Sequence, residues 1–128
     1  MTNDSLSDLL TRIKNGYLAR KDRLEAPYSK LKLSVLKVLQ DYGYVQNVQK
    51  TADGKTLTVG LVYEKGVPAL TEIKRISTPG RRQYADIGAL KKIENPLGFY
   101  IISTSKGIKT HIEAQKTRMG GELLCFVW

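Results

Sequence analysis

Residues 1–65 carry a helical and then an extended pattern of apolar positions. In residues 4–21 apolar side chains recur every three or four positions, which predicts an amphipathic helix. Ser29 can cap a second helix that runs to Tyr42, and Gly43 can end it in the left-handed conformation. The residues expected to face inward are Leu6, Leu9, Leu10, Ile13 and Tyr17 in the first helix, and Leu31, Val35, Leu36, Val38, Leu39 and Tyr42 in the second.

Short extended segments accompany these helices. The segment "LEAPYS" lies between them, and its Pro27 bars a helix. Further on, "YVQNVQK" and "KTLTVGLVYE" are rich in β-branched and aromatic residues and flank "TADG". This pattern predicts a hairpin that turns at Asp53 and Gly54. The first part of the chain is therefore predicted to have the order α-β-α-β-β.

A second part is expected beyond a linker at residues 66–71, because Gly66 and Pro68 interrupt both patterns. The segments "TEIKRIS", "FYIIST" and "ELLCFVW" are strand candidates, and the last is apolar enough to be a central strand. The stretch "YADIGALKKI" is weakly patterned and has room for one helical turn. Thr110 and Glu113 stand in capping-box register and predict a short helix that runs to about Arg118.

These elements predict an α+β fold of two small subdomains. Residues 1–65 would form the N-terminal subdomain with the order α-β-α-β-β. Residues 72–128 would form a C-terminal subdomain that is mostly β with one short helix, and the linker at residues 66–71 would join the two.

Charge adds the first indication of function. The 128 residues include 21 Lys and Arg against 12 Asp and Glu, a net charge of +9, with a pI of about 9.7. Residues 73–128 contribute +6 of this excess and residues 1–72 contribute +3. A polyanionic partner is therefore expected, mainly at the second part. We expect a soluble, cytoplasmic protein with no membrane segment, and a buried, passive Cys125 that has no partner for a disulfide.

The stretch "STSKGIKTHIEA", residues 103–114, has more small hydroxyl side chains than a plain turn needs. It does not match a phosphate-binding P-loop, because Lys106 precedes Gly107 and no Lys-Ser or Lys-Thr pair opens a helix. A hydrolase that uses Ser103 or Ser105 with His111 would still need an orienting carboxylate and an oxyanion hole. Two explanations stay open: the hydroxyls satisfy backbone groups around a turn, or they contact a nucleic acid.

Another segment, "KRISTPGRRQY", favours the second explanation, contact with a nucleic acid. It places Lys74, Arg75, Arg81 and Arg82 around a turn and ends at Tyr84, a ring on which a base or ribose can pack. Short hydroxyl side chains suit the wide, shallow minor groove of A-form RNA, where 2'-hydroxyls are displayed. A protein that reads B-DNA would more often present a helix to the major groove. The sequence therefore favours RNA over DNA.

Several stretches together resemble the bacterial family of small-subunit ribosomal protein number eight. These are "SDLLTRIKNG", "YSKLK", "KRISTPGRRQY", "LGFYIISTSKGIKT" and "GGELLCFVW", which occur in the family's order and cover most of the chain. The resemblance implies a two-part α+β protein whose second part grips an irregular stem of the 16S ribosomal RNA central domain by its minor groove. It implies a structural role in the 30S subunit and its assembly, with no catalytic step, cofactor or metal.

The resemblance also implies roles for individual residues. It implies that Glu122 either accepts a base amino group or ribose hydroxyl, or orders the serine loop from behind. Gly107 and Gly121 would permit close backbone approach, and Lys106 would meet phosphate. The principal RNA contacts expected are Ser103, Thr104, Ser105, Lys106 and Gly107, joined by Tyr84, Arg82, Gly121 and Glu122, with less direct contacts at Arg12, Lys14, Asn15, Lys30 and Arg81.

The expected partners are the 16S RNA, neighbouring small-subunit proteins and, by family analogy, the protein's own operon messenger RNA. The expected location is the cytoplasm, in association with the ribosome. The alternative is a generic module that binds double-stranded nucleic acid or regulates transcription.

Overall fold

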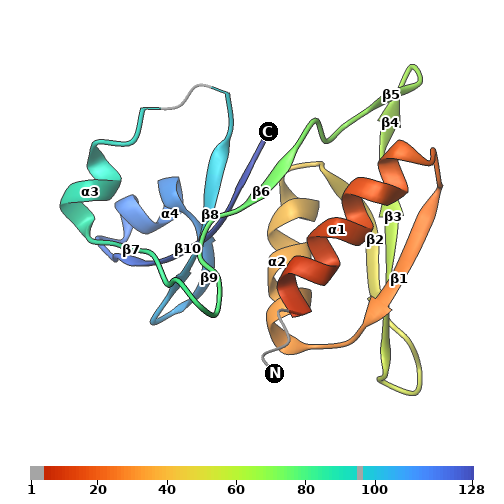
Figure 1. Ribbon diagram of the computed structural model, residues 1–128, viewed down its shortest axis with the longest axis horizontal. Coiled ribbons are helices and arrows are strands. Elements are labelled where there is room, and N and C mark those ends of the chain that lie inside the picture. The colour runs from red at the N-terminus through yellow and green to blue at the C-terminus, as the bar shows by residue number, and fades with distance from the viewer. Residues whose placement is uncertain (1–4, 95–96) are drawn as a thin grey trace. The chain divides into compact units, whose positions relative to one another are not determined.

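The N-terminal elements follow the α-β-α-β-β order that the apolar pattern predicts. The computed structural model describes residues 5–94 and 97–128, which divide into two units at residues 71 and 72 (Figure 1). The elements of the first unit are α1 (Ser5–Leu18), β1 (Arg23–Pro27), α2 (Lys30–Asp41), β2 (Val45–Lys50), β3 (Thr56–Leu61), β4 (Tyr63–Glu64) and β5 (Val67–Pro68).

The N-terminal unit is built on an antiparallel sheet with the strand order β1-β3-β2. Helices α1 and α2 pack against this sheet and against each other. Alternate residues of β1 and β3 are buried, as expected for strands with one covered face. The buried residues of these two strands include Leu24, Ala26, Leu57, Val59 and Leu61, and those of α1 are the predicted Leu6, Leu9, Leu10, Ile13 and Tyr17.

Helix α2 has the predicted start and end, but its inward face differs from the prediction. The Ser29 hydroxyl caps the helix by accepting a hydrogen bond from the Lys32 backbone nitrogen at 3.1 Å, and Gly43 has φ +81°. Leu31 and Tyr42 were predicted to face inward, which is wrong: they are 38% and 43% exposed. Lys32 is buried in the first turn instead, because an aliphatic stem can cover apolar surface.

A short hairpin precedes the boundary between the units. Strands β4 and β5 pair antiparallel, and Lys65 and Gly66 between them both have positive φ, at +53° and +80°. Two such residues form the turn type that matches the twist of a hairpin. Residues 66–68 thus belong to a hairpin, and the chain that follows leads directly to the second unit.

In the described part of the C-terminal unit, residues 72–94 and 97–128, there are a five-stranded sheet and two short helices. Its strand order is β6-β10-β8-β9, and β7 pairs with β10 beyond the end of β6. The elements are β6 (Ile73–Arg75), β7 (Tyr84–Ala85), α3 (Ile87–Lys91), β8 (Phe99–Thr104), β9 (Gly107–Thr110), α4 (His111–Lys116) and β10 (Gly121–Val127). The expectation of a central "ELLCFVW" strand is confirmed, since β10 has partners on both sides.

Local signals set the helices of this unit. Thr110 caps α4 by accepting a hydrogen bond from the Glu113 backbone nitrogen at 3.2 Å, as predicted, although α4 ends earlier than predicted. Helices α3 and α4 pack together, and α4 packs on β8. Leu90, Ile102 and Ala114 form a buried cluster between them.

The prediction for residues 103–110 was only partly right. The chain after the apolar run was expected to connect a strand directly to a helix. Instead, residues 107–110 return as β9 alongside β8, with Thr104 opposite Gly107 and Ser103 opposite Ile108. The hydroxyl-rich stretch is therefore the tip of a β-hairpin. Pairing of β9 with β8 gives hydrogen-bond partners to backbone N–H and C=O groups that would lack them in a loop.

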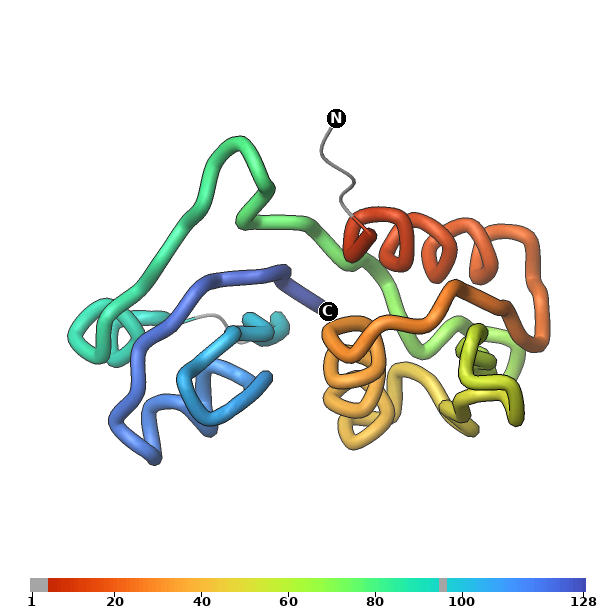
Figure 2. The backbone as a smooth tube through the Cα atoms, turned by 90° about the horizontal axis from the view of Figure 1, so that it is seen from below, coloured from red at the N-terminus to blue at the C-terminus, as the bar shows by residue number. Residues whose placement is uncertain are grey.

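From residue 5 onward the chain passes from the first unit to the second at residues 71 and 72, in the green part of the tube in Figure 2. Cys125 is fully buried on β10, and burial raises the pKa of its thiol to about 12 although the charge of Arg75 lowers it. It is therefore a packing residue with an inert thiol. Within residues 5–94 and 97–128 no helix has the length and apolar character needed to span a membrane.

Replacing the cap of α2 should lower the stability of the protein. Ser29→Ala removes the acceptor for the Lys32 amide, so the free energy of unfolding should fall by about 1 kcal/mol in denaturant titrations. Ser34→Ala is the matched control, because Ser34 lies within the same helix and its hydroxyl bonds only the Lys30 carbonyl. Equal losses in the two variants would contradict the cap.

Candidate nucleic-acid interface

The tip of the β8–β9 hairpin presents the serine-rich stretch to solvent. Ser105 and Lys106 form the turn, and both are exposed together with Gly107. Gly107 has φ +113°, a conformation in which a side chain is strained, so the turn requires glycine there. Ser105 donates a hydrogen bond to the Met119 sulfur at 3.8 Å. All five residues predicted for the principal contact, 103–107, lie in this hairpin.

Thr104 shapes the hairpin tip. Its hydroxyl donates to the Gly107 carbonyl at 2.8 Å and accepts a hydrogen bond from the Lys106 backbone nitrogen at 3.2 Å. One of the three hydroxyls therefore satisfies backbone groups around the turn, which is the structural explanation that the sequence left open.

The sheet brings residues from three separate stretches into one row. Glu122 on β10 lies opposite Tyr84 on one side and opposite Ser103 on the other. Directly opposite residues of antiparallel strands project to the same face. Tyr84 is 71% exposed there, so its ring is open to a partner. The turn at residues 78–82 (the middle turn), strand β10 and the β8–β9 hairpin (the serine hairpin) thus meet at one edge of the unit.

Gly121 is needed for a reason that differs from the one expected. A Cβ at this position would lie 2.2 Å from the Ser103 carbonyl oxygen and 2.9 Å from the Ile102 side chain. The space that a side chain would fill is occupied by the neighbouring strand. The glycine therefore allows close approach of β8 to β10 within the protein.

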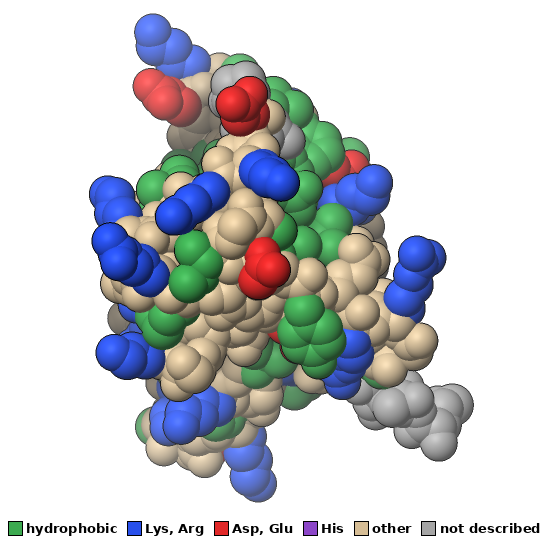
Figure 3. All heavy atoms as spheres, turned by 90° about the vertical axis from the view of Figure 1, so that its left-hand side faces the viewer, with side chains coloured by type: hydrophobic (Ala, Val, Ile, Leu, Met, Phe, Trp, Pro, Cys, Tyr) green, Lys and Arg blue, Asp and Glu red, His purple; other side chains and the backbone are tan. Residues whose placement is uncertain are grey.

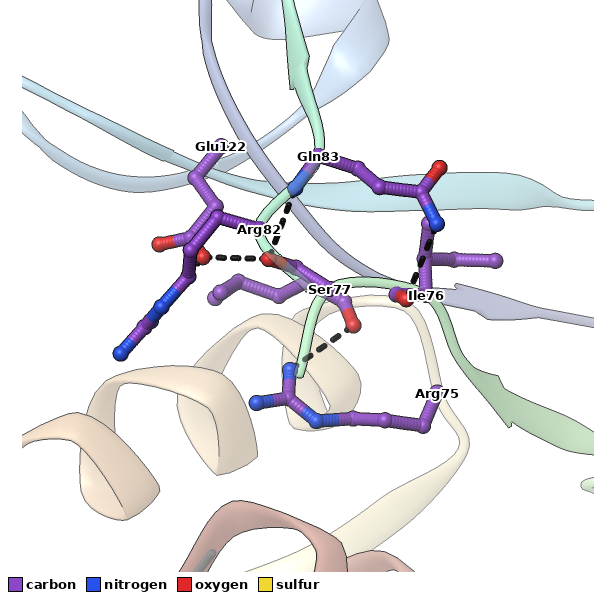
Figure 4. Close-up of polar contacts among 7 residues, drawn as sticks. Arg75, Ile76, Ser77, Arg82, Gln83 and Glu122 are labelled. Carbon is purple, nitrogen blue, oxygen red and sulfur yellow. Dashed lines mark hydrogen bonds and ion pairs between the residues drawn. The ribbon is translucent and has the colours of Figure 1, made fainter. Parts of the chain in front are cut away.

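The turn that carries the two arginines is tied to Glu122. Thr78 and Arg81 close the turn by exchanging backbone hydrogen bonds at 3.0 and 3.1 Å. The Glu122 carboxylate accepts hydrogen bonds from the Ser77 hydroxyl and, at 3.0 Å, from the Arg82 guanidinium (Figure 4). Glu122 thus orders the middle turn with its side chain, whereas only its backbone pairs with the serine hairpin.

This carboxylate is ionised. Its side chain is only 15% exposed, and burial opposes ionisation. The hydrogen bonds from Ser77 and Arg82, with the charges of Arg82 and Arg75, outweigh burial and lower the pKa of Glu122. Glu122 and Arg82 consequently form an ion pair at the edge of the interface.

The surface around this edge is basic. Figure 3 shows a face on which Lys and Arg side chains, in blue, are spread with few acidic side chains, in red. The exposed cations of the C-terminal unit include Lys74, Arg81, Arg82, Lys91, Lys92, Lys106, Lys116 and Arg118.

The N-terminal unit holds a second basic surface, at a hollow of about 540 Å³ between α1 and β1. Arg12 and Asn15 line it, three residues apart on one face of α1. Arg12 is held by Asp8 at 2.9 Å and by the Glu25 carbonyl at 3.2 Å. The sequence prediction grouped Lys14 and Lys30 with these residues, but neither lines the hollow.

Comparisons with known proteins identify the family. The family model described as ribosomal protein S8 matches residues 4–128. The small ribosomal subunit protein uS8 of Pseudomonas aeruginosa (strain PAO1) is 44% identical over 126 residues, covering 98% of this chain and 97% of its own. Proteins of the same name from Methylocella silvestris and Desulfovibrio desulfuricans are 43% and 41% identical, with 98% and 100% of each chain covered. This chain belongs to the ribosomal protein S8 family.

Membership confirms the resemblance inferred from the motifs. The S8 family consists of structural ribosomal proteins and is not an enzyme family. His111, the partner that a hydrolase would need, is buried, and its Nδ1 accepts a hydrogen bond from the Tyr100 backbone nitrogen at 3.0 Å. Burial lowers the pKa of His111, and the ring packs edge-on to Tyr100. His111 in this S8 chain is a core residue.

Sequence analysis missed three residues of these S8 surfaces. Ser77 lies in a quoted motif, but nothing in its neighbourhood marked it as the partner of Glu122, which is distant in sequence. Lys21 and Arg23 line the N-terminal hollow with Arg12 and Asn15. Their place in the basic run after the first helix was the available signal.

The ionised state of Glu122 makes a prediction for the pH dependence of stability. A carboxyl whose pKa is lowered by folding contributes stability that is present above its ordinary value and is lost as pH falls through the folded pKa. Glu122→Gln should therefore be less stable than wild type by about 1 to 3 kcal/mol at neutral pH, and the gap should shrink below about pH 4. Denaturant titrations at several pH values measure it, and a gap that does not change with pH would contradict the assignment.

Proposed function

We propose that this chain is a structural component of the small ribosomal subunit that binds the central domain of 16S ribosomal RNA and supports 30S assembly. Its location would be the cytoplasm, in association with the ribosome and neighbouring small-subunit proteins. The observation that carries the proposal is the meeting of the exposed hairpin tip, residues 105–107, with the exposed Tyr84 ring at one edge of a basic unit. RNA binding would reside in residues 72–128, with residues 1–65 as a second subdomain; of the linker predicted at residues 66–71, residues 66–68 belong to the β4–β5 hairpin.

In the proposed mechanism, cationic side chains attract the RNA backbone, and other side chains recognise the shape of the RNA. Lys106 and Arg81 offset phosphate repulsion without reading sequence. The hydroxyls of Ser103 and Ser105 address 2'-hydroxyls and base edges in the minor groove, and Tyr84 packs on a base or ribose. In this proposal an irregular stem, and not a regular helix, fits both the hairpin tip and the ring.

Internal partners divide the predicted contacts into two kinds. Thr104 and Glu122 have protein partners for their polar atoms, and Gly121 faces a neighbouring strand, so these three shape the surface. Ser105 bonds only the Met119 sulfur by its hydroxyl, and sulfur is a weak acceptor. Exchanging the Met119 sulfur for an acceptor on RNA would cost the Ser105 hydroxyl little free energy. We therefore assign Ser105 to direct contact with RNA.

A second RNA segment is proposed at the N-terminal hollow. Arg12, Asn15, Lys21 and Arg23 line it together with the acidic residue Glu25, and three cations against one carboxylate suit a phosphate backbone. Lys14 and Lys30 lie outside the hollow and would contribute through charge alone.

An alternative role as a DNA-binding or transcriptional module finds less support. Such a module commonly inserts a recognition helix into the major groove. Within the described part of the basic unit the helices are α3, with five residues, and α4, with six. Neither is long enough to present the usual reading face, so RNA remains the better partner.

The biological effect would follow from mass action. A protein that binds one RNA fold, and not the unfolded strand, stabilises that fold by a free energy that grows with the logarithm of its free concentration relative to the Kd. This accounts for a role in assembly without a catalytic step or cofactor. The same site would bind the protein's operon messenger RNA if that RNA folds into a similar stem.

The deciding experiment compares three nucleic acids across a salt series. They are a small-subunit central-domain stem, a fully paired RNA and a DNA duplex of equal length. The irregular stem should bind best at physiological salt, and Ser105→Ala should weaken it by about 1 to 2 kcal/mol, the cost of one unmade hydrogen bond. Ser34→Ala on α2 is the control. Equal, salt-sensitive binding to all three would contradict the proposal.

Lys106→Ala should change the salt dependence. The loss of one phosphate contact should lower the slope of log affinity against log salt by a little under one, and should weaken all RNAs to a similar degree. Lys37→Ala removes the same charge from the exposed face of α2 and should leave the slope unchanged. Equal slopes for wild type and Lys106→Ala would remove Lys106 from the interface.

A further inference from the structure

Ser77 is a buried hydroxyl at the junction of two chain segments. It is 0% exposed and opens the turn that carries Arg81 and Arg82. Its hydroxyl donates to the Glu122 carboxylate on β10 and accepts a hydrogen bond from the Gln83 backbone nitrogen at 3.1 Å (Figure 4). One side chain thereby ties the beginning and the end of the turn to the central strand.

Backbone hydrogen bonds surround this junction. The Ser77 nitrogen donates to the Leu123 carbonyl at 3.0 Å, and the Leu123 nitrogen donates to the Gln83 carbonyl at 2.9 Å. The residue after Gln83 is Tyr84, whose backbone pairs with Glu122. The hydroxyl of Ser77 therefore holds the backbone nitrogen of Gln83, the residue that immediately precedes the exposed ring.

Removing this hydroxyl would leave two groups short of a partner. The Gln83 amide would lose its acceptor, and the ionised Glu122 would lose a donor while Arg82 stayed. Unmade hydrogen bonds at a buried position carry the full cost of desolvation, so the turn would shift to recover partners. Such a shift moves Tyr84 relative to the hairpin, without changing any charge or any exposed atom of Ser77.

We propose that Ser77 is a positioning residue for RNA recognition, which sets the place of Tyr84 against the β8–β9 hairpin. The inference rests on the proposed function and deepens it. Ser77 has no surface with which to touch RNA, yet it controls how well the protein separates an irregular stem from a regular one. Recognition of shape needs two surface elements at a defined spacing, and a supporting residue maintains that spacing.

The test uses Ser77→Ala in the full chain with an irregular central-domain stem and a fully paired RNA. Affinity for the irregular stem should fall about tenfold, the equivalent of one buried hydrogen bond, and affinity for the paired RNA should stay within about twofold. The salt slope should not change, because no charge is removed. Circular dichroism confirms that each variant is folded at the temperature of measurement.

Thr110→Ala is the matched control. Thr110 is also a fully buried hydroxyl residue of the C-terminal unit, and it caps α4 and not the turn. Its loss should lower the unfolding temperature while affinities for both RNAs stay within about twofold in the folded protein. Equal loss of RNA affinity in Thr110→Ala and Ser77→Ala would show a general effect of stability and would overturn the inference.

A double-mutant cycle with Tyr84→Ala separates positioning from simple structural support. If Ser77 acts by placing Tyr84, then Ser77→Ala should cost less than about twofold once the ring is absent. Independent, multiplicative effects would overturn the inference, and so would an unchanged affinity in Ser77→Ala. A wild-type chain without preference for the irregular stem would overturn the proposed function, and the inference with it, before any variant is compared.

Discussion

The C-terminal unit depends on the pairing of β10 with strands on both of its sides. β8 runs along one side, while β6 and β7 pair with different parts of the other. The chain between β6 and β7 must therefore leave the sheet and return to it, and it does so as the turn that carries Arg81 and Arg82. One backbone register thus sets the positions of the middle turn, Tyr84 and the serine hairpin together.

Polar side chains complete what this register begins, and each has a separate task. The Thr104 hydroxyl closes the hairpin tip, the Ser77 hydroxyl closes the middle turn, and the Glu122 carboxylate joins that turn to β10. Ser105 keeps a weak bond to sulfur that can be exchanged. The proposed interface consequently has internally satisfied groups that hold its shape and other groups that can meet a partner.

The basic charge has a different character from these contacts. Phosphate attraction acts over several ångströms and tolerates small displacements, so Lys106 and Arg81 could serve from exposed side chains. Recognition of shape tolerates much less displacement, because hydrogen bonds fail when atoms move by a fraction of an ångström. This contrast explains why the carboxylate and hydroxyl network is buried and the cations are not.

The sequence by itself determined the features that depend on local chemistry. Caps at Ser29 and Thr110, the apolar stripe of α1, the strand character of residues 121–127 and the charge excess all act within a few residues or as a sum, so they could be predicted. Tertiary structure alone decided the rest. The β9 strand, the bond between Ser77 and Glu122 and the space taken from Gly121 by Ser103 all join residues far apart in sequence or depend on strand pairing. No local pattern encodes such pairs, because their free energy arises only when the folded sheet brings the two partners within hydrogen-bonding distance.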